Sequence, residues 1–167
     1  MGDWNLFFAT AAGSAATLVG LLFVATQLNL AIFKDPTNRF AALAQASLTV
    51  LSLIFLVALF FLIPALDLRA RGDIIVVVVT FAVWRTVRIW WPVVKIGEKG
   101  RRHRLAQSFW LLIVPFIVYA YLLTGAIGLI QGQMSATLTV AAAFLALFTI
   151  ALRNAWRLVV SAVHEPA

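Results

Sequence analysis

The sequence predicts an all-α, polytopic transmembrane helical bundle of five helices, with the N-terminus outside and the C-terminus cytoplasmic. The first observation is composition, because 63% of the 167 residues are hydrophobic and only 11% are charged. Soluble domains are roughly half apolar and about a quarter charged, so lipid must replace water around this chain. The second observation is five long apolar segments, and the third is the distribution of Lys and Arg among their connectors.

The five segments follow from the thickness of a bilayer. A hydrocarbon core of about 30 Å needs roughly 20 apolar residues per helix. Five segments qualify, and they form a single transmembrane domain over residues 1–167 with helices at approximately 6–33, 40–66, 74–94, 105–130 and 136–160. The connectors are short, and their predicted helix breakers are Pro36, Gly72, Gly97, Gly100 and Gly132.

The first segment is predicted to be a retained helix and not a cleaved signal. The opening "MGDWNLFF" has no basic n-region, and no A-x-A-like cleavage site follows a short apolar core. Small residues at helical spacing predict a packing seam here, with a related position in the fourth segment, because helices in lipid associate through close backbone contact. The seam residues are Ala12, Gly13, Ala16, Gly20 and Gly128. Packing within one chain is the simpler interpretation, and packing between chains is the alternative.

The second segment carries a mild polar stripe. Gln45, Thr49 and Ser52 lie at positions i, i+4 and i+7, which fall on one side of a helix. Hydrogen bonding between helices is the usual role of such groups in membranes. A water-lined polar path is the alternative interpretation.

The third segment holds two arginines inside the run "TFAVWRTVRIWWPVV". With Ile74 at the outer boundary, Arg85 lies about 16 Å deep and Arg88 about 21 Å deep. A central arginine costs at least about 2.5 kcal/mol, and none of the six acidic residues falls inside a predicted span. The pair is therefore expected either to extend toward the headgroups or to face a water-filled, anion-attracting cavity.

Basic residues continue from this pair toward the cytoplasmic side. Arg85, Arg88, Lys95, Lys99 and Arg102 follow steps that keep them on one side of a helix. Together with neighbouring basic residues they form the candidate contact set for anions or lipid headgroups. That set comprises Arg85, Arg88, Lys95, Lys99, Arg101, Arg102, Arg104, Arg153 and Arg157.

Orientation follows from the positive-inside rule. With the N-terminus outside, nine Lys and Arg residues fall on the cytoplasmic side and only Arg69 and Arg71 fall outside. A four-helix alternative requires the third segment to end at Trp84, which would leave it too short to span. The four-helix alternative moves Arg153 and Arg157 outside, so fewer Lys and Arg residues lie on the cytoplasmic side and the agreement with the positive-inside rule is poorer.

The sequence shows no arrangement of residues that is typical of a catalytic site. No metal-ligand spacing and no intramembrane Ser–His or paired-acid arrangement occurs, so no enzyme and no cofactor is expected. We expect a multi-pass protein of the cell inner (plasma) membrane, forming homo-oligomers. The first functional hypothesis is an anion-attracting channel whose inner vestibule is lined by Arg85 and Arg88.

The alternative hypothesis is a structural or regulatory membrane protein. Its basic cytoplasmic face would bind anionic lipid headgroups or a partner protein, because each surface Lys or Arg near anionic lipid contributes about 1 kcal/mol. The net charge of +7 is attributed to such lipid contacts, and no nucleic acid partner is expected.

Overall fold

The computed structural model is all-helical, which confirms the predicted fold class at that level. Its five helices, in chain order, are α1 (Gly2–Leu28), α2 (Arg39–Leu62), α3 (Leu68–Gly97), α4 (Arg102–Ile130) and α5 (Ala136–His164). The structure describes the backbone of residues 2–28, 39–97 and 102–164, and the side chains of 4–27, 41–91 and 113–157. Each helix contains a span long and apolar enough to cross a membrane.

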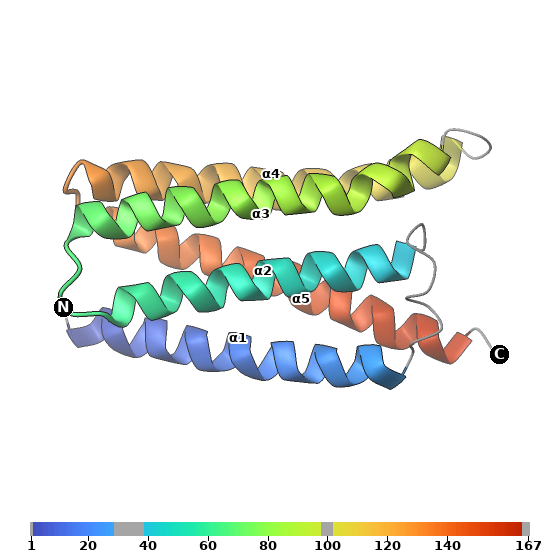
Figure 1. Cartoon of the computed structure of the whole chain (residues 1–167), viewed down its shortest axis with the longest axis horizontal. Coiled ribbons are helices and arrows are strands. Elements are labelled where there is room, and N and C mark those ends of the chain that lie inside the picture. The colour runs from blue at the N-terminus through green and yellow to red at the C-terminus, as the bar shows by residue number, and fades with distance from the viewer. Residues whose placement is uncertain (1, 29–38, 98–101, 165–167) are drawn as a thin grey trace.

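The helices form an elongated bundle with α2 and α5 at its centre (Figure 1). α2 packs against α1, α3 and α5, whereas α4 packs against α3 and α5. The N-terminus, the α2–α3 connection and the α4–α5 turn lie at one end of the bundle, and the C-terminus lies at the other (Figure 1). We call the first of these ends the α2–α3 end.

The boundary between α2 and α3 differs from the sequence expectation. α2 ends at Leu62 and not near residue 66, just before Pro64, which has no backbone N–H to continue a helix. α3 already begins at Leu68, because a carboxylate oxygen of Asp67 accepts a 2.8 Å hydrogen bond from the backbone N–H of Ala70 and caps the first turn.

Two glycines allow the helices to approach closely. Gly72 lies inside α3 and is not a helix breaker as predicted. A Cβ atom at this position would lie 2.7 Å from the backbone oxygen of Ala126 and 2.6 Å from Cγ1 of Ile130, both in α4. Gly128 plays the same part between α4 and α5, since its Cβ would lie 2.7 Å from Cβ of Ala136.

The turn between α4 and α5 follows the prediction for Gly132. This residue has a φ of 79°, in the left-handed region that glycine adopts without a steric penalty. The backbone N–H of Gln133 donates a 2.9 Å hydrogen bond to the oxygen of Gly128, which is the pattern of a helix that ends at a left-handed glycine.

The core near the α2–α3 end is aromatic. The ring of Phe8 stacks on Phe61 with centroids 4.1 Å apart, and it meets Phe144 edge-on at 5.8 Å. Farther along, Tyr119, Leu122 and other large side chains are fully buried between the helices. Over the part that the structure describes, the centre of a single chain is therefore packed mainly with apolar side chains.

Candidate functional site

The two arginines lie on one continuous helix. α3 runs without interruption from Leu68 to Gly97. Its apolar part, Leu68–Trp91, is long enough to cross a membrane, which favours five spans over the four-helix alternative. Arg85 and Arg88 are both exposed on the outside of the bundle. Neither side chain points into the packed centre of its own chain.

Arg88 belongs to an exposed aromatic stripe along α3. The stripe is formed by Val77, Phe81, Trp84, Arg88 and Trp91, whose steps of four and three residues follow one line on a helix. The guanidinium carbon of Arg88 lies 5.3 Å from the ring centroid of Trp84, and this ring lies 5.7 Å from that of Phe81. A cation over an indole is stabilised by the negative face of the ring, so Arg88 has a favourable contact within its own chain.

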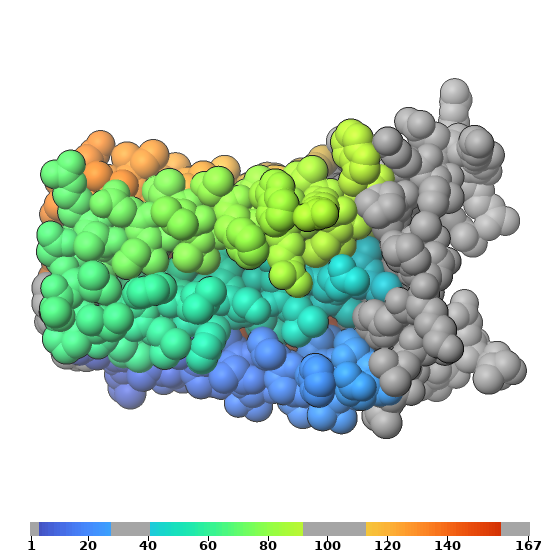
Figure 2. Space-filling model, viewed as in Figure 1, coloured from blue at the N-terminus to red at the C-terminus, as the bar shows by residue number. Residues whose placement is uncertain are grey.

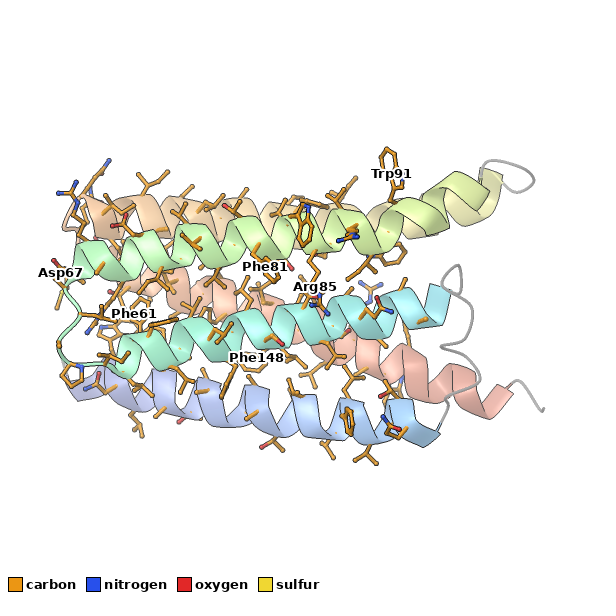
Figure 3. All side chains as sticks on the ribbon, viewed as in Figure 1. Phe61, Asp67, Phe81, Arg85, Trp91 and Phe148 are labelled. Carbon is orange, nitrogen blue, oxygen red and sulfur yellow. The ribbon has the colours of Figure 1, made fainter. Side chains whose placement is uncertain are left out.

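Arg85 has no such compensation. Among the described residues it makes no hydrogen bond, ion pair or ring contact. Its side chain projects from α3 over α2 (Figure 3). Arg85 is thus an exposed charge in the middle part of α3 that no other described residue contacts through a hydrogen bond, an ion pair or an aromatic ring.

The level of Arg85 along the bundle can be found from a contact at the α2–α3 end. There, the guanidinium carbon of Arg71 lies 5.4 Å from the ring centroid of Phe61, so these residues share a level. α2 and α3 run in opposite directions (Figure 1). Fourteen residues farther along α3, about 21 Å, Arg85 is therefore level with Ser47 of α2, which is fourteen residues before Phe61.

Two residues of the predicted polar stripe lie on this side, within about 8 Å of this level along the helix. Gln45 and Ser52 are exposed, and they share a line on α2 with the exposed Leu56 and Leu59. α1, α3 and α5 cover the other sides of α2, which leaves the side that faces the viewer in Figures 1 and 2. Arg85 projects over this same side. We call the surface formed by Gln45, Ser52 and Arg85 the α2–α3 polar face.

The remaining member of the stripe is internal. Thr49 is buried, and its hydroxyl donates a 2.9 Å hydrogen bond to the backbone oxygen of Gln45 in its own helix. Ser47 does the same with Leu43. The stripe is therefore divided between the core and the surface, and it does not line a single interior path.

The predicted packing seam is divided as well. Ala12 is buried in the core, and Gly128 lies at the close approach of α4 and α5 described above. In contrast, Gly13, Ala16 and Gly20 are exposed, and a Cβ atom at either glycine would meet no atom within 4 Å. The outward part of the seam leaves a shallow, small-residue surface on α1.

The other predicted basic contacts fall near the opposite end of the bundle from the α2–α3 end. Arg153 is exposed on α5, and Arg157, one turn later, is half-buried. The side chains of Lys95, Arg102 and Arg104 lie outside the described residues, although their backbones belong to α3 and α4, and Lys99 and Arg101 lie outside them entirely.

The sequence does not predict a pair of buried hydroxyl groups between α3 and α4. Thr86 of α3 faces Tyr119 of α4 in the core. Both hydroxyl oxygens are buried, and neither makes a hydrogen bond of acceptable geometry. No pattern in the sequence pairs these two positions, because their contact depends on how α3 and α4 rotate against each other.

The described residues contain no cluster of three or more His, Cys, Asp or Glu side chains that would hold a metal ion. Comparisons with protein-family models, curated proteins and solved structures find no match to this chain.

Proposed function

We propose that this protein is a homo-oligomeric membrane protein whose copies surround an anion-attracting vestibule lined by the α2–α3 polar face. The observation that carries this proposal is the position of Arg85. It is an exposed guanidinium, about 21 Å along α3 from the level of Arg71, without a counter-ion or hydrogen bond in the described part of its chain.

The cost of this arginine supports an assembly over an isolated chain. A guanidinium placed against hydrocarbon costs at least about 2.5 kcal/mol at the centre of a span. Water in a vestibule between copies removes most of this cost, since it hydrates the guanidinium, and the exposed Gln45 and Ser52 add polar surface beside it. The packed aromatic and aliphatic core makes a path through one chain unfavourable.

Two other surfaces are suited to hold neighbouring copies together. The α3 stripe presents the large side chains of Phe81, Trp84 and Trp91, while α1 presents the small-residue surface at Gly13 and Gly20. Large side chains that enter a small-residue groove give the close contact that helices in lipid require.

The depths of these two surfaces also match. Phe8 and Arg71 both contact Phe61, so they mark one level on α1 and α3, and the two helices run in the same direction (Figure 1). Gly20 lies twelve residues beyond Phe8, and Trp84 lies thirteen beyond Arg71, so both are about 18–20 Å from that level. α1 of one copy can therefore meet α3 of the next, and such head-to-tail contacts form a ring when the rotation between copies closes.

The orientation in the membrane is part of the same proposal. The N-terminus is placed outside and the C-terminus in the cytoplasm, because nine Lys and Arg residues then lie inside and two lie outside. The vestibule opens toward the basic cytoplasmic side of the plasma membrane. A ring of Arg85 attracts anions and repels cations there.

The direct experiment is electrical. The wild-type protein is reconstituted into a planar bilayer, and the reversal potential is measured in a chloride gradient. We expect an anion-selective reversal potential that moves toward zero in Arg85→Gln. The control is Arg69→Gln, which removes an exposed arginine of the same helix near its start and is expected to leave the potential unchanged. Equal potentials in wild type and Arg85→Gln would refute a role for Arg85 in conduction.

A second candidate function is binding of anionic lipid or a partner protein through the basic cytoplasmic face. The exposure of Arg153 and Trp156, three residues apart on α5, favours it, because a basic residue beside an indole suits the headgroup level. Native mass spectrometry with phosphatidylglycerol tests it. Retained lipid that is lost in the Arg101→Gln, Arg102→Gln variant supports this function, and equal retention of a zwitterionic lipid contradicts it.

A further inference from the structure

A cavity of about 150 Å³ lies at the α2–α3 end of the bundle, far from the α2–α3 polar face. Helices α1, α2, α3 and α5 and two connections contribute to its walls. The walls are mainly apolar, with Trp4, Phe8, Phe61 and Pro64 among the side chains that line it. One cation, Arg71, also lines the cavity.

Arg71 is held in place but not neutralised. Its Nη2 donates a 3.3 Å hydrogen bond to the backbone oxygen of Ile63, and its guanidinium lies over the ring of Phe61. Its Nε is buried without a hydrogen-bond partner. These contacts fix the guanidinium at the cavity wall and leave several of its five N–H donors without an acceptor in the described residues.

No nearby carboxylate forms an ion pair with Arg71 in the part of the chain that the structure describes. Asp67 caps the N-terminus of α3, where its side chain accepts the hydrogen bond from the backbone N–H of Ala70. Asp73 is exposed and forms no ion pair with Arg71. The cavity therefore carries a net positive charge against apolar walls.

We propose that this cavity binds a small organic oxyanion, with its carboxylate or phosphate on Arg71 and its apolar part against Phe8 and Phe61. Guanidinium groups match such oxyanions in both charge and geometry. A cavity of this volume accommodates a group of about the size of benzene. The oxyanion comes either from a free small carboxylate or from the phosphate of a phospholipid at the membrane surface.

This inference does not rest on the proposed function, since it concerns the start of α3, about 21 Å along the helix from Arg85. The test uses the full-length protein in a neutral detergent, with benzoate as the probe and isothermal titration calorimetry as the readout. Benzamide, which has the same ring and no charge, is the matched ligand. We expect benzoate to bind at least about tenfold more tightly than benzamide, because hydrogen bonds between charged groups are stronger than those of a neutral amide.

Variants locate the binding. Arg71→Gln is expected to weaken benzoate at least about tenfold, whereas Arg69→Gln, an exposed neighbour two residues away, leaves it unchanged. Competition with phosphatidylglycerol identifies the source of the oxyanion: displacement of benzoate supports a lipid phosphate, and no displacement supports a free carboxylate.

Three results overturn the proposal, and two of them need no variant. Equal binding of benzoate and benzamide by the wild type would show that the charge has no role. Unchanged benzoate binding in Arg71→Gln, or no saturable binding to the wild type, would exclude a site at this cavity. Conduction of the same variants, measured after reconstitution into a planar bilayer, is a separate readout, so the failure of this inference is distinguishable from the failure of the proposed function.

Discussion

The close approach of α3 and α4 at Gly72 gives a prediction whose size follows from the structure. In Gly72→Ala, the new methyl carbon would lie 2.7 Å from the backbone oxygen of Ala126 and 2.6 Å from a side-chain carbon of Ile130. The Ile130 contact can be relieved by a change of rotamer, but the Ala126 oxygen moves only with the backbone of α4. Overpacking of this kind costs about 1–3 kcal/mol.

The higher helix propensity of alanine opposes this steric cost. A second substitution, Gly20→Ala, measures the gain in helix propensity without the steric cost. Alanine is favoured over glycine inside a helix by about 1 kcal/mol. In Gly20→Ala the methyl group meets no atom of its own chain within 4 Å, so in the dissociated chain only the propensity gain applies. We therefore expect Gly72→Ala to lower the free energy of unfolding by up to about 2 kcal/mol and Gly20→Ala to raise it or leave it unchanged.

The assay is reversible unfolding in mixed micelles of a mild detergent and sodium dodecyl sulfate, followed by helical circular dichroism. The two variants differ in their contacts and share the same chemical change, so their difference isolates the α3–α4 contact. If Gly72→Ala unfolds at the same or a higher denaturant fraction than Gly20→Ala, the close approach of the two helices is not as the structure describes it.

Three further predictions concern the interface, the cap and the core. Gly20→Leu should keep the helical content of the monomer but lower the oligomeric mass in size-exclusion light scattering, since the added side chain fills the proposed groove; an unchanged mass contradicts that interface. Asp67→Ala should cost about 1 kcal/mol of unfolding free energy through loss of the α3 cap, and an unchanged denaturation midpoint would show that the cap is not stabilising. The double variant Thr86→Val, Tyr119→Phe should unfold at an equal or higher denaturant fraction, because it removes two buried hydroxyls without partners; clear destabilisation would reveal a hydrogen bond or a bound water between them.

The helices themselves are predictable because each has enough apolar residues to cross a bilayer, whatever its neighbours do. The continuity of α3 through Arg85 and Arg88 follows from the same argument, since a shorter helix would not span. The cap at Asp67 was not predicted, because the charged residues after it were assigned to a connector.

The surroundings of individual side chains depend on helix rotation, which one sequence does not determine. Gly13 and Ala12 are adjacent in sequence, yet Ala12 is buried and Gly13 is exposed. The apolar residues of this chain surround most of each helix, so they give little indication of the side that faces the core. The cavity at Arg71 requires four helices and two connections to meet, and no spacing within one segment reveals it.

The contact pattern of α5 has a consequence for how the chain assembles. α1 has α2 as its main neighbour, and α3 and α4 pair with each other, so two hairpins can form as soon as their helices are synthesised. α5 is made last, and it packs against both α2 and α4, one helix from each hairpin. A ribosome that stalls or a chain cut before residue 136 would therefore leave two hairpins joined mainly through α2 and α3, with the side that α5 normally occupies open to lipid, quality-control proteases or a foreign helix.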